Sequence, residues 1–239
     1  MLKTRALWVL AGLTAVLLCG CAPDGLDLLR AVLDADAEET ERLLTRGADP
    51  NLRLPGDVAL TEMAARIRHV EVMEVLLNHG ADPNVVSRKG DSALLECAEG
   101  GMIHGVKLLL DHGAEPDLRK PDWFTPLCLA ASGGHRETAK LLVAAGADVN
   151  AVSRGQWSVL DYAAAGPKAE MVRWLCSEGA DPNFIPDIGV PPIHHAARSG
   201  HPDVIQALKH NTEVKLFIGA AEVLARVRTL GTEVIEPGE

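Results

Sequence analysis

Apolar residues recur along this chain in short blocks that each fit one face of a helix, and the blocks come in pairs. Between residues 120 and 152, Leu127 and Ala130 belong to one block, and Ala139 and Leu142 belong to the next. Gly133-Gly134 separates the two blocks and is a typical helix stop. The pattern predicts two short antiparallel helices joined by a tight turn.

The paired blocks repeat with a step of 33 residues. Five copies of a Gly-Ala-Asp-x-Asn word mark the step, with Glu and Asp replacing Asp and Asn in the third copy; the copies begin at Gly47, Gly80, Gly113, Gly146 and Gly179. A glycine after an apolar block can adopt the left-handed conformation that ends a helix. The short polar residues behind it are expected to brace the loop. A fixed period of this size predicts a stacked-repeat array in which each unit buries its apolar face against its neighbours.

The repeat strongly resembles the ankyrin repeat. Thr125-Pro126-Leu127-Cys128-Leu129-Ala130-Ala131 is similar to the family's T-P-L-H-x-A-A, and Ile193-His194-His195-Ala196-Ala197 keeps its histidine. The resemblance covers residues 26 to 210. It implies an all-α solenoid of about six helix-turn-helix repeats with β-hairpin loops. It also implies protein–protein binding through the hairpin tips and the adjoining first-helix face, with no catalysis and no cofactor.

The hairpin glycine of the family is present in only some repeats. Gly90 and Gly189 keep it, whereas Asp57, Trp123 and Gln156 replace it. We therefore expect less regular hairpins at these three replacements.

The repeat register also predicts the boundaries of the chain's parts. The next Gly-Ala-Asp word is due at Thr212, where apolar residues recur at helical spacing instead. The predicted parts are a lipoprotein signal peptide at 1–20, a short tether at 21–25, the repeat array at 26–211, a C-terminal capping helix at 212–231 and a flexible tail at 232–239.

The N-terminus is typical of an exported protein. Lys3 and Arg5 precede an apolar run from Ala6 to Leu18, which is too short to span a bilayer. The run ends in Leu18-Cys19-Gly20-Cys21, similar to a bacterial lipoprotein signal in which Cys21 receives the lipid, including palmitate. Ala22 at the next position then implies the periplasmic face of the outer membrane. The alternative is an ordinary cleaved signal and a soluble periplasmic protein.

The net charge, the cysteines and the histidines argue against several classes of function. The formal net charge of −10 argues against nucleic acid and against electrostatic attachment to a membrane surface. Cys97, Cys128 and Cys176 occupy apolar helix positions and are expected to act as small buried hydrophobes. Five of the nine histidines fall at two repeated helix-end positions, and His194 and His195 are adjacent on a helix, so their side chains do not converge and no metal site is predicted.

Cations and aromatic residues gather at the predicted hairpin tips. Such residues are enriched in binding hot spots, although a solvated charge run with structural aromatics is the alternative. The predicted protein-binding residues are Arg88, Lys89, Arg119, Lys120, Trp123, Phe124, Arg154 and Trp157. We expect a monomer that binds a protein offering carboxylates and an apolar pocket. It is either a scaffold for a periplasmic or membrane-associated partner, or an immunity protein that neutralises a toxin delivered to the periplasm.

Overall fold

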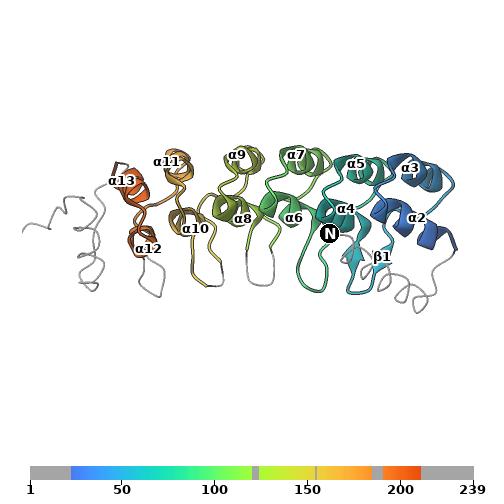
Figure 1. Ribbon diagram of the computed structural model, residues 1–239, viewed down its shortest axis with the longest axis horizontal. Helices are drawn as coiled ribbons and strands as arrows, with labels where there is room; N and C mark the ends of the chain where they lie inside the picture. The colour runs from blue at the N-terminus through green and yellow to red at the C-terminus, as the bar shows by residue number, and fades with distance from the viewer. Residues whose placement is uncertain (1–22, 120–123, 154, 185–190, 211–239) are drawn as a thin grey trace, which may run out of the picture. The chain divides into compact units, whose positions relative to one another are not determined.

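The computed structural model of the protein describes residues 23–119, 124–153, 155–184 and 191–210, and these contain six pairs of helices (Figure 1). The chain divides into two compact units, residues 1–97 with 102–120 and residues 98–101 with 121–239. The predicted signal peptide, the candidate lipidation residue Cys21 and the predicted cap at 212–231 lie outside the described residues. Within the described ranges, no helix has both the length and the apolar character needed to cross a membrane.

Unit 1, the N-terminal unit, consists of helix pairs and one short hairpin. Its first helices and its second helices form two rows (Figure 1). The first helices are α2 (Pro23–Leu33), α4 (Leu60–Arg66) and most of α6 (Ala93–Glu99), and the second helices are α3 (Ala37–Thr45), α5 (Val70–Asn78) and α7 (Ile103–Asp111). Strands β1 (Arg53–Leu54) and β2 (Val58–Ala59) pair antiparallel and lead directly into α4.

Unit 2, the C-terminal unit, repeats the same arrangement. Its first helices are α8 (Pro126–Gly133), α10 (Val159–Ala164) and α12 (Pro192–Ser199), and its second helices are α9 (Arg136–Ala144), α11 (Ala169–Ser177) and α13 (Pro202–His210). A single antiparallel bridge between Val152 and Ser158 closes the hairpin before α10. The helix pairs predicted from the 33-residue period are confirmed in both units.

Side-chain caps fix where several helices begin. Thr125 accepts a hydrogen bond from the Cys128 amide at the start of α8, and Asp36 does the same for the Glu39 amide at the start of α3. Ser158 and Asp161 form a reciprocal capping box at α10. Gly134 ends α8 in the left-handed conformation, as the sequence predicted for the glycines behind apolar blocks.

Helix α2 begins earlier than the sequence indicated. Its first residue is Pro23, inside the segment predicted as a tether at 21–25. Proline has no backbone N–H, but an N–H in the first turn of a helix would have no partner within the helix. Its fixed φ also suits the start of a helix. The helix therefore extends three residues beyond the first strongly apolar residue, Leu26.

The core of each unit lies between its two rows of helices and consists almost entirely of aliphatic side chains. In unit 1, Leu60, Met73 and Leu94 are fully buried, and in unit 2, Leu127 and Leu160 are buried to the same degree. The small residues at the Ala-Ala positions of each first helix, such as Ala130 and Ala131 in α8, have no exposed surface. Close helix packing over small side chains explains why the chain needs so few aromatic residues.

The Asp and Asn of the repeated Gly-Ala-Asp-x-Asn word brace the loops, as predicted. Asp82 accepts a hydrogen bond from the Asn84 amide within one loop. The Asn84 side chain then donates to the Gly113 carbonyl at 2.9 Å and accepts from the Glu115 amide at 2.7 Å in the next loop. Asn51 and Asn150 make the same pair of bonds in their own units. The carboxylates and amides of this word therefore hold neighbouring repeats together.

The prediction of less regular hairpins without glycine was wrong for Gln156. Gln156 adopts φ of 62°, in the same left-handed region as Gly90 at φ of 80°, and both amides donate to the carbonyl three residues earlier. Asp57 also has φ of 62°, but Gly56 before it has φ of 87°, so this hairpin has a different turn. At both replacements the non-glycine residue carries a steric cost of about 1 kcal/mol or more for placing Cβ near the carbonyl. The third replacement, Trp123, lies outside the described residues.

We expect Gln156→Gly to raise the free energy of unfolding by about 0.5–1 kcal/mol, because glycine removes the left-handed strain but costs some chain entropy on folding. Gln156 is the cleaner position for this test, since Asp57 also forms an ion pair. Denaturant unfolding of the variant and wild type measures the difference. Gly90→Ala, at the corresponding hairpin position with φ of 80°, is the converse variant and should lower the free energy of unfolding. Equal or lower stability of Gln156→Gly would contradict the strain argument.

Candidate protein-binding surface

Four aromatic rings meet beside the hairpins of unit 2. Phe124 precedes α8 and lies 5.4 Å from Tyr162, measured between ring centroids. Trp157 precedes α10, with centroid distances of 5.2 Å to Tyr162 and 4.0 Å to His195 of α12. Phe124, Trp157 and Tyr162 are half-buried, whereas His195 is buried. We call these four residues the aromatic cluster.

The hairpin before α10 holds the cluster in place. The Tyr162 hydroxyl donates to Ser153 Oγ at 2.9 Å, and the Trp157 amide donates to the same oxygen at 3.3 Å. The Ser153 amide donates back to the Trp157 carbonyl at 2.9 Å. Ser153 itself is almost fully buried. Because one serine fixes both residues, the two rings are positioned before any partner arrives, which lowers the entropy lost on binding.

The buried imidazole of the cluster, His195, lies near a buried carboxylate, Asp161. Asp161 Oδ2 accepts from both the amide and the hydroxyl of Ser158, at 2.8 and 2.7 Å. Its other oxygen lies 3.7 Å from His195 Nε2, too far for a hydrogen bond, and neither of these two atoms has a hydrogen-bond partner. Burial raises the pKa of Asp161 to about 6, against the effect of the Ser158 hydrogen bonds. Burial, followed by the charges of His194 and Arg198, lowers the pKa of His195 to about 4.

This arrangement has the residue types of a hydrolase triad without its chemistry. A catalytic hydroxyl would donate to the imidazole, which acts as the base. Here the Ser158 hydroxyl donates to Asp161, and the imidazole makes no hydrogen bond to either residue. Ser158 is also 4% exposed, so a substrate carbonyl has no route to it. The arrangement of these three residues therefore does not support hydrolysis.

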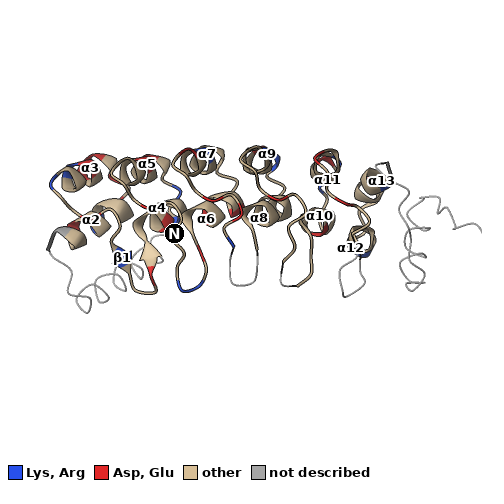
Figure 2. Ribbon diagram, turned by 180° about the vertical axis from the view of Figure 1, so that it is seen from behind, with Lys and Arg blue, Asp and Glu red and all other residues tan. Residues whose placement is uncertain are grey.

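The hairpins of unit 1 carry the predicted cations, but one of these cations is paired with a carboxylate. Lys89 and Arg119 are exposed at the tips of unit 1. Arg88 is also exposed, but its Nε donates to Asp57 Oδ2 of the preceding hairpin at 2.7 Å, and its amide donates to the Gly56 carbonyl at 2.7 Å. Figure 2 shows basic and acidic segments at these neighbouring tips. The tips of unit 1 therefore carry an ion pair beside exposed cations, and not a uniform cationic stripe.

The remaining predicted binding residues divide into two groups. Phe124 and Trp157 lie together in the aromatic cluster, joined through Tyr162. Lys120, Trp123 and Arg154 lie outside the described residues, so their roles stay predictions. The proposed hot spot at Trp123 directly precedes Phe124 in sequence.

Tyr162 and His195 were not predicted as site residues, although their spacing in the sequence relates them. The two residues are 33 positions apart and occupy the same place on successive first helices. Tyr162 is also the chain's single tyrosine. The same position holds Leu129 in the preceding repeat, so a polar aromatic residue there departs from the apolar pattern.

Unit 1 contains a second polar cluster that the sequence did not predict. The Arg66 guanidinium contacts Glu62, Asp91 and Glu96, at 2.8, 3.0 and 3.0 Å. Glu62 is fully buried, and burial raises its pKa to about 7 although Arg66 lowers it. The Glu62 contact is an ion pair without a directed hydrogen bond. Three such close carboxylates are also ligands that a hard divalent cation prefers, but Arg66 already supplies their counter-charge.

Three histidines and the three cysteines occupy structural positions. His79 and His112 cap the C-terminal ends of α5 and α7, and His69 caps the N-terminus of α5. Cys97 and Cys128 are buried free thiols, and Cys176 is half-buried. Burial raises the pKa of Cys97 to about 12 and that of Cys176 to about 11. Cys97 and Cys176 are therefore protonated near neutral pH, as expected of small hydrophobic side chains.

Comparison with known proteins identifies the class. A family model described as "Ankyrin repeats (3 copies)" matches residues 28–122 and 117–186. The crystal structure of the human ASB11 ankyrin repeat domain is similar, with a TM-score of 0.73 and 24% sequence identity, over 84% of this chain and 88% of that chain. No curated protein matches this chain.

The chain belongs to the ankyrin-repeat family. The predicted fold class, an all-α ankyrin solenoid with about six helix pairs, is confirmed by the matched family and the solved structure. Ankyrin-repeat domains are typically non-enzymatic scaffolds for protein–protein interaction. The prediction that this chain is not an enzyme is in keeping with this class.

Proposed function

We propose that the protein binds a protein partner with the hairpin tips and first-helix faces of its repeats. The observation that carries the proposal is the aromatic cluster: three half-buried rings lie beside the hairpins in contact through Tyr162, and Ser153 fixes Tyr162 and Trp157. Tryptophan and tyrosine supply large contact areas with few rotatable bonds, and both are enriched in binding hot spots.

The chemistry of the surface defines the partner. The aromatic cluster accommodates an apolar or aromatic side chain, and the exposed tip cations Lys89 and Arg119 suit carboxylates. The partner is therefore a protein that offers both an apolar segment and carboxylates. Charges at the tips are expected to act mainly on the association rate, and the rings mainly on the dissociation rate.

We also propose that the protein is anchored by a lipid on Cys21 and faces the periplasm from the outer membrane. Support comes from the basic, apolar and Leu-x-Gly-Cys segments of the N-terminus. Helix α2 begins at Pro23, so only Ala22 separates Cys21 from the first repeat. A single residue spans less than about 4 Å, so the anchor would hold the first helix pair at the membrane surface.

Affinity capture from envelope extract tests the binding proposal. The bait is the tagged protein, compared with a Lys89→Glu variant and a Phe124→Ala variant. The account predicts one protein that is retained by wild type and depleted by both variants. Retention unaffected by both substitutions would contradict the proposed surface. If the captured protein is a toxin that enters the periplasm, the role is that of an immunity protein and not of a resident scaffold.

The anchor has its own test. Cys21→Ser is expected to abolish incorporation of labelled palmitate and to move the protein from the outer-membrane fraction to the soluble periplasmic fraction. Cys19→Ser, two residues earlier, is the matched control and should leave both unchanged. Labelling that persists in Cys21→Ser would contradict the lipoprotein proposal without affecting the binding proposal.

A further inference from the structure

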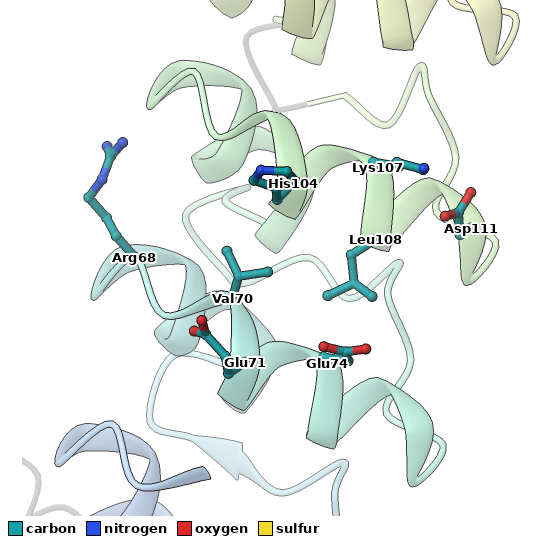
Figure 3. A pocket seen from close by; sticks show the side chains of 8 residues that line it. All are labelled: Arg68, Val70, Glu71, Glu74, His104, Lys107, Leu108 and Asp111. Atoms are coloured by element: carbon teal, nitrogen blue, oxygen red, sulfur yellow. The ribbon is translucent and has the colours of Figure 1, made fainter.

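The Asp161–His195 pair of unit 2 leaves two buried polar atoms without partners. Asp161 Oδ1 and His195 Nε2 lie 3.7 Å apart, and within the described part of the chain neither has a hydrogen-bond partner. By contrast, the groove between α5 and α7 of unit 1, with a volume of about 540 Å³, is lined by charged side chains that reach solvent, such as Glu74 and Lys107 (Figure 3). Solvent satisfies the polar atoms of those side chains, but it does not reach the two atoms of the pair. Buried polar atoms without a partner are rare in folded proteins and call for an explanation.

The pair lacks a proton to share. The 3.7 Å gap is about 1 Å longer than a strong hydrogen bond between an oxygen and a nitrogen, so a small rotation of either side chain would close it. Asp161 Oδ1 and His195 Nε2 are both acceptors when the carboxyl is ionised and the imidazole carries its proton on Nδ1. Two facing acceptors repel each other, which accounts for the gap.

The carboxyl is the member of the pair that takes up a proton first. Burial raises the pKa of Asp161 to about 6, against the effect of its hydrogen bonds to Ser158. Burial lowers the pKa of His195 to about 4. As the pH falls, Asp161 is therefore protonated while the imidazole is still neutral and able to accept. A protonated carboxyl has an O–H donor, which the ionised form does not.

The charged neighbours of the pair favour the same order of protonation. His194 and Arg198 lie on the same helix as the imidazole, and their positive charges add to the effect of burial on its pKa. Helix α8, which packs against α10, contributes the thiol of Cys128, which acts on Tyr162 and not on the pair. Within the described residues, α11 and α13 contribute no charge that acts on either group.

We infer that the Asp161–His195 pair takes up one proton in mild acid, and that the new hydrogen bond from Asp161 Oδ1–H to His195 Nε2 changes the position of Trp157. The proton comes from solvent, and the pair changes from one negative charge to none. Closing the gap moves the imidazole by up to about 1 Å, and the Trp157 ring lies against the imidazole with 4.0 Å between centroids. The consequence rests on the proposed function: binding at the aromatic cluster becomes dependent on pH.

The switch can be followed by NMR in the free protein, using the full-length chain in detergent. We expect the indole N–H resonance of Trp157, assigned with Trp157→Phe, to show one transition centred near pH 6. Asp161→Asn should abolish the transition and hold the resonance near its acidic wild-type position, because its amide donates to His195 Nε2 at every pH. His194→Asn is the matched control: it removes the adjacent histidine and should leave the transition in place.

Several results would overturn the inference. One is a Trp157 resonance that stays unchanged between pH 8 and pH 5, and another is a transition that persists in Asp161→Asn. A third is a nitrogen spectrum in which His195 Nε2 already carries a proton at pH 8. If Asp161→Asn does not fold, His195→Phe keeps a ring against Trp157 without the nitrogen, and it should also lose the transition. None of these measurements needs a partner, so their failure leaves the proposed protein binding untouched.

Discussion

Replacement of Arg66 by methionine is expected to lower the free energy of unfolding by about 3 kcal/mol at pH 8. The substitution keeps most of the packing but leaves Glu62, which is fully buried, without its counter-charge and close to Asp91 and Glu96. Removing one partner of a buried ion pair strands the other charge in a poorly solvated site. Denaturant unfolding of the two proteins at fixed salt measures the loss.

The loss should shrink as the pH falls. Burial raises the pKa of Glu62 from 4.5 to about 7, so the folded protein binds this proton more tightly than the unfolded chain. The cost of burying the charged carboxylate is therefore absent below about pH 4.5 and grows as the pH rises toward 7. At pH 5 the carboxyl of the Arg66→Met variant is protonated, and little charge is stranded.

Two further variants separate charge from packing. Glu62→Gln combined with Arg66→Met should recover most of the stability lost at pH 8. Arg30→Met removes an exposed arginine whose 3.6 Å contact with Asp34 is open to solvent, and it should change stability by no more than about 0.5 kcal/mol. If Arg66→Met costs the same at pH 5 and pH 8, the ion pair is not what stabilises this site.

Trp157→Ala is expected to weaken partner binding by about 30-fold, or about 2 kcal/mol, because it removes the central ring of the aromatic cluster. Trp157 contacts both Tyr162 and His195, so the substitution should also lower the melting temperature. Isothermal titration at a temperature where the variant is fully folded separates the two effects.

Tyr162→Phe serves as the matched control for Trp157→Ala. It keeps the ring and removes only the hydroxyl that donates to Ser153. We expect a small stability loss and nearly unchanged affinity, since the apolar surface remains. A Trp157→Ala variant that is destabilised yet binds the partner as tightly as wild type would show that the cluster is structural.

The sequence predicted the repeats well because each repeat depends on local signals. The glycine behind each apolar block, the caps at Thr125 and Ser158, and the Asp and Asn of the repeated word all act within a few residues or one repeat. A fixed period of 33 residues then determines which residues of neighbouring repeats meet. For this reason Phe124 and Trp157, which share one repeat position, were expected on the same surface.

The ion pairs of unit 1 were not predicted, because they depend on residues that differ between repeats. The buried Glu62 has Arg66 of its own helix as its counter-charge, and Asp91 and Glu96 of the following repeat contact the same arginine. Asp57 adopts the left-handed conformation and pairs with Arg88. Such pairings depend on side-chain geometry, which periodicity alone does not give.

Site-specific photo-crosslinking in living cells tests the central claim, that the hairpin tips and first-helix faces bind a protein partner. Crosslinking residues would be placed at Lys89 and Gly155, both exposed at hairpin tips, and at Lys140 and Arg173 on the second helices of unit 2 as controls. The account predicts that the two tip positions crosslink to the same protein and the two control positions do not. Crosslinks confined to Lys140 and Arg173, or equal at all four positions, would contradict it.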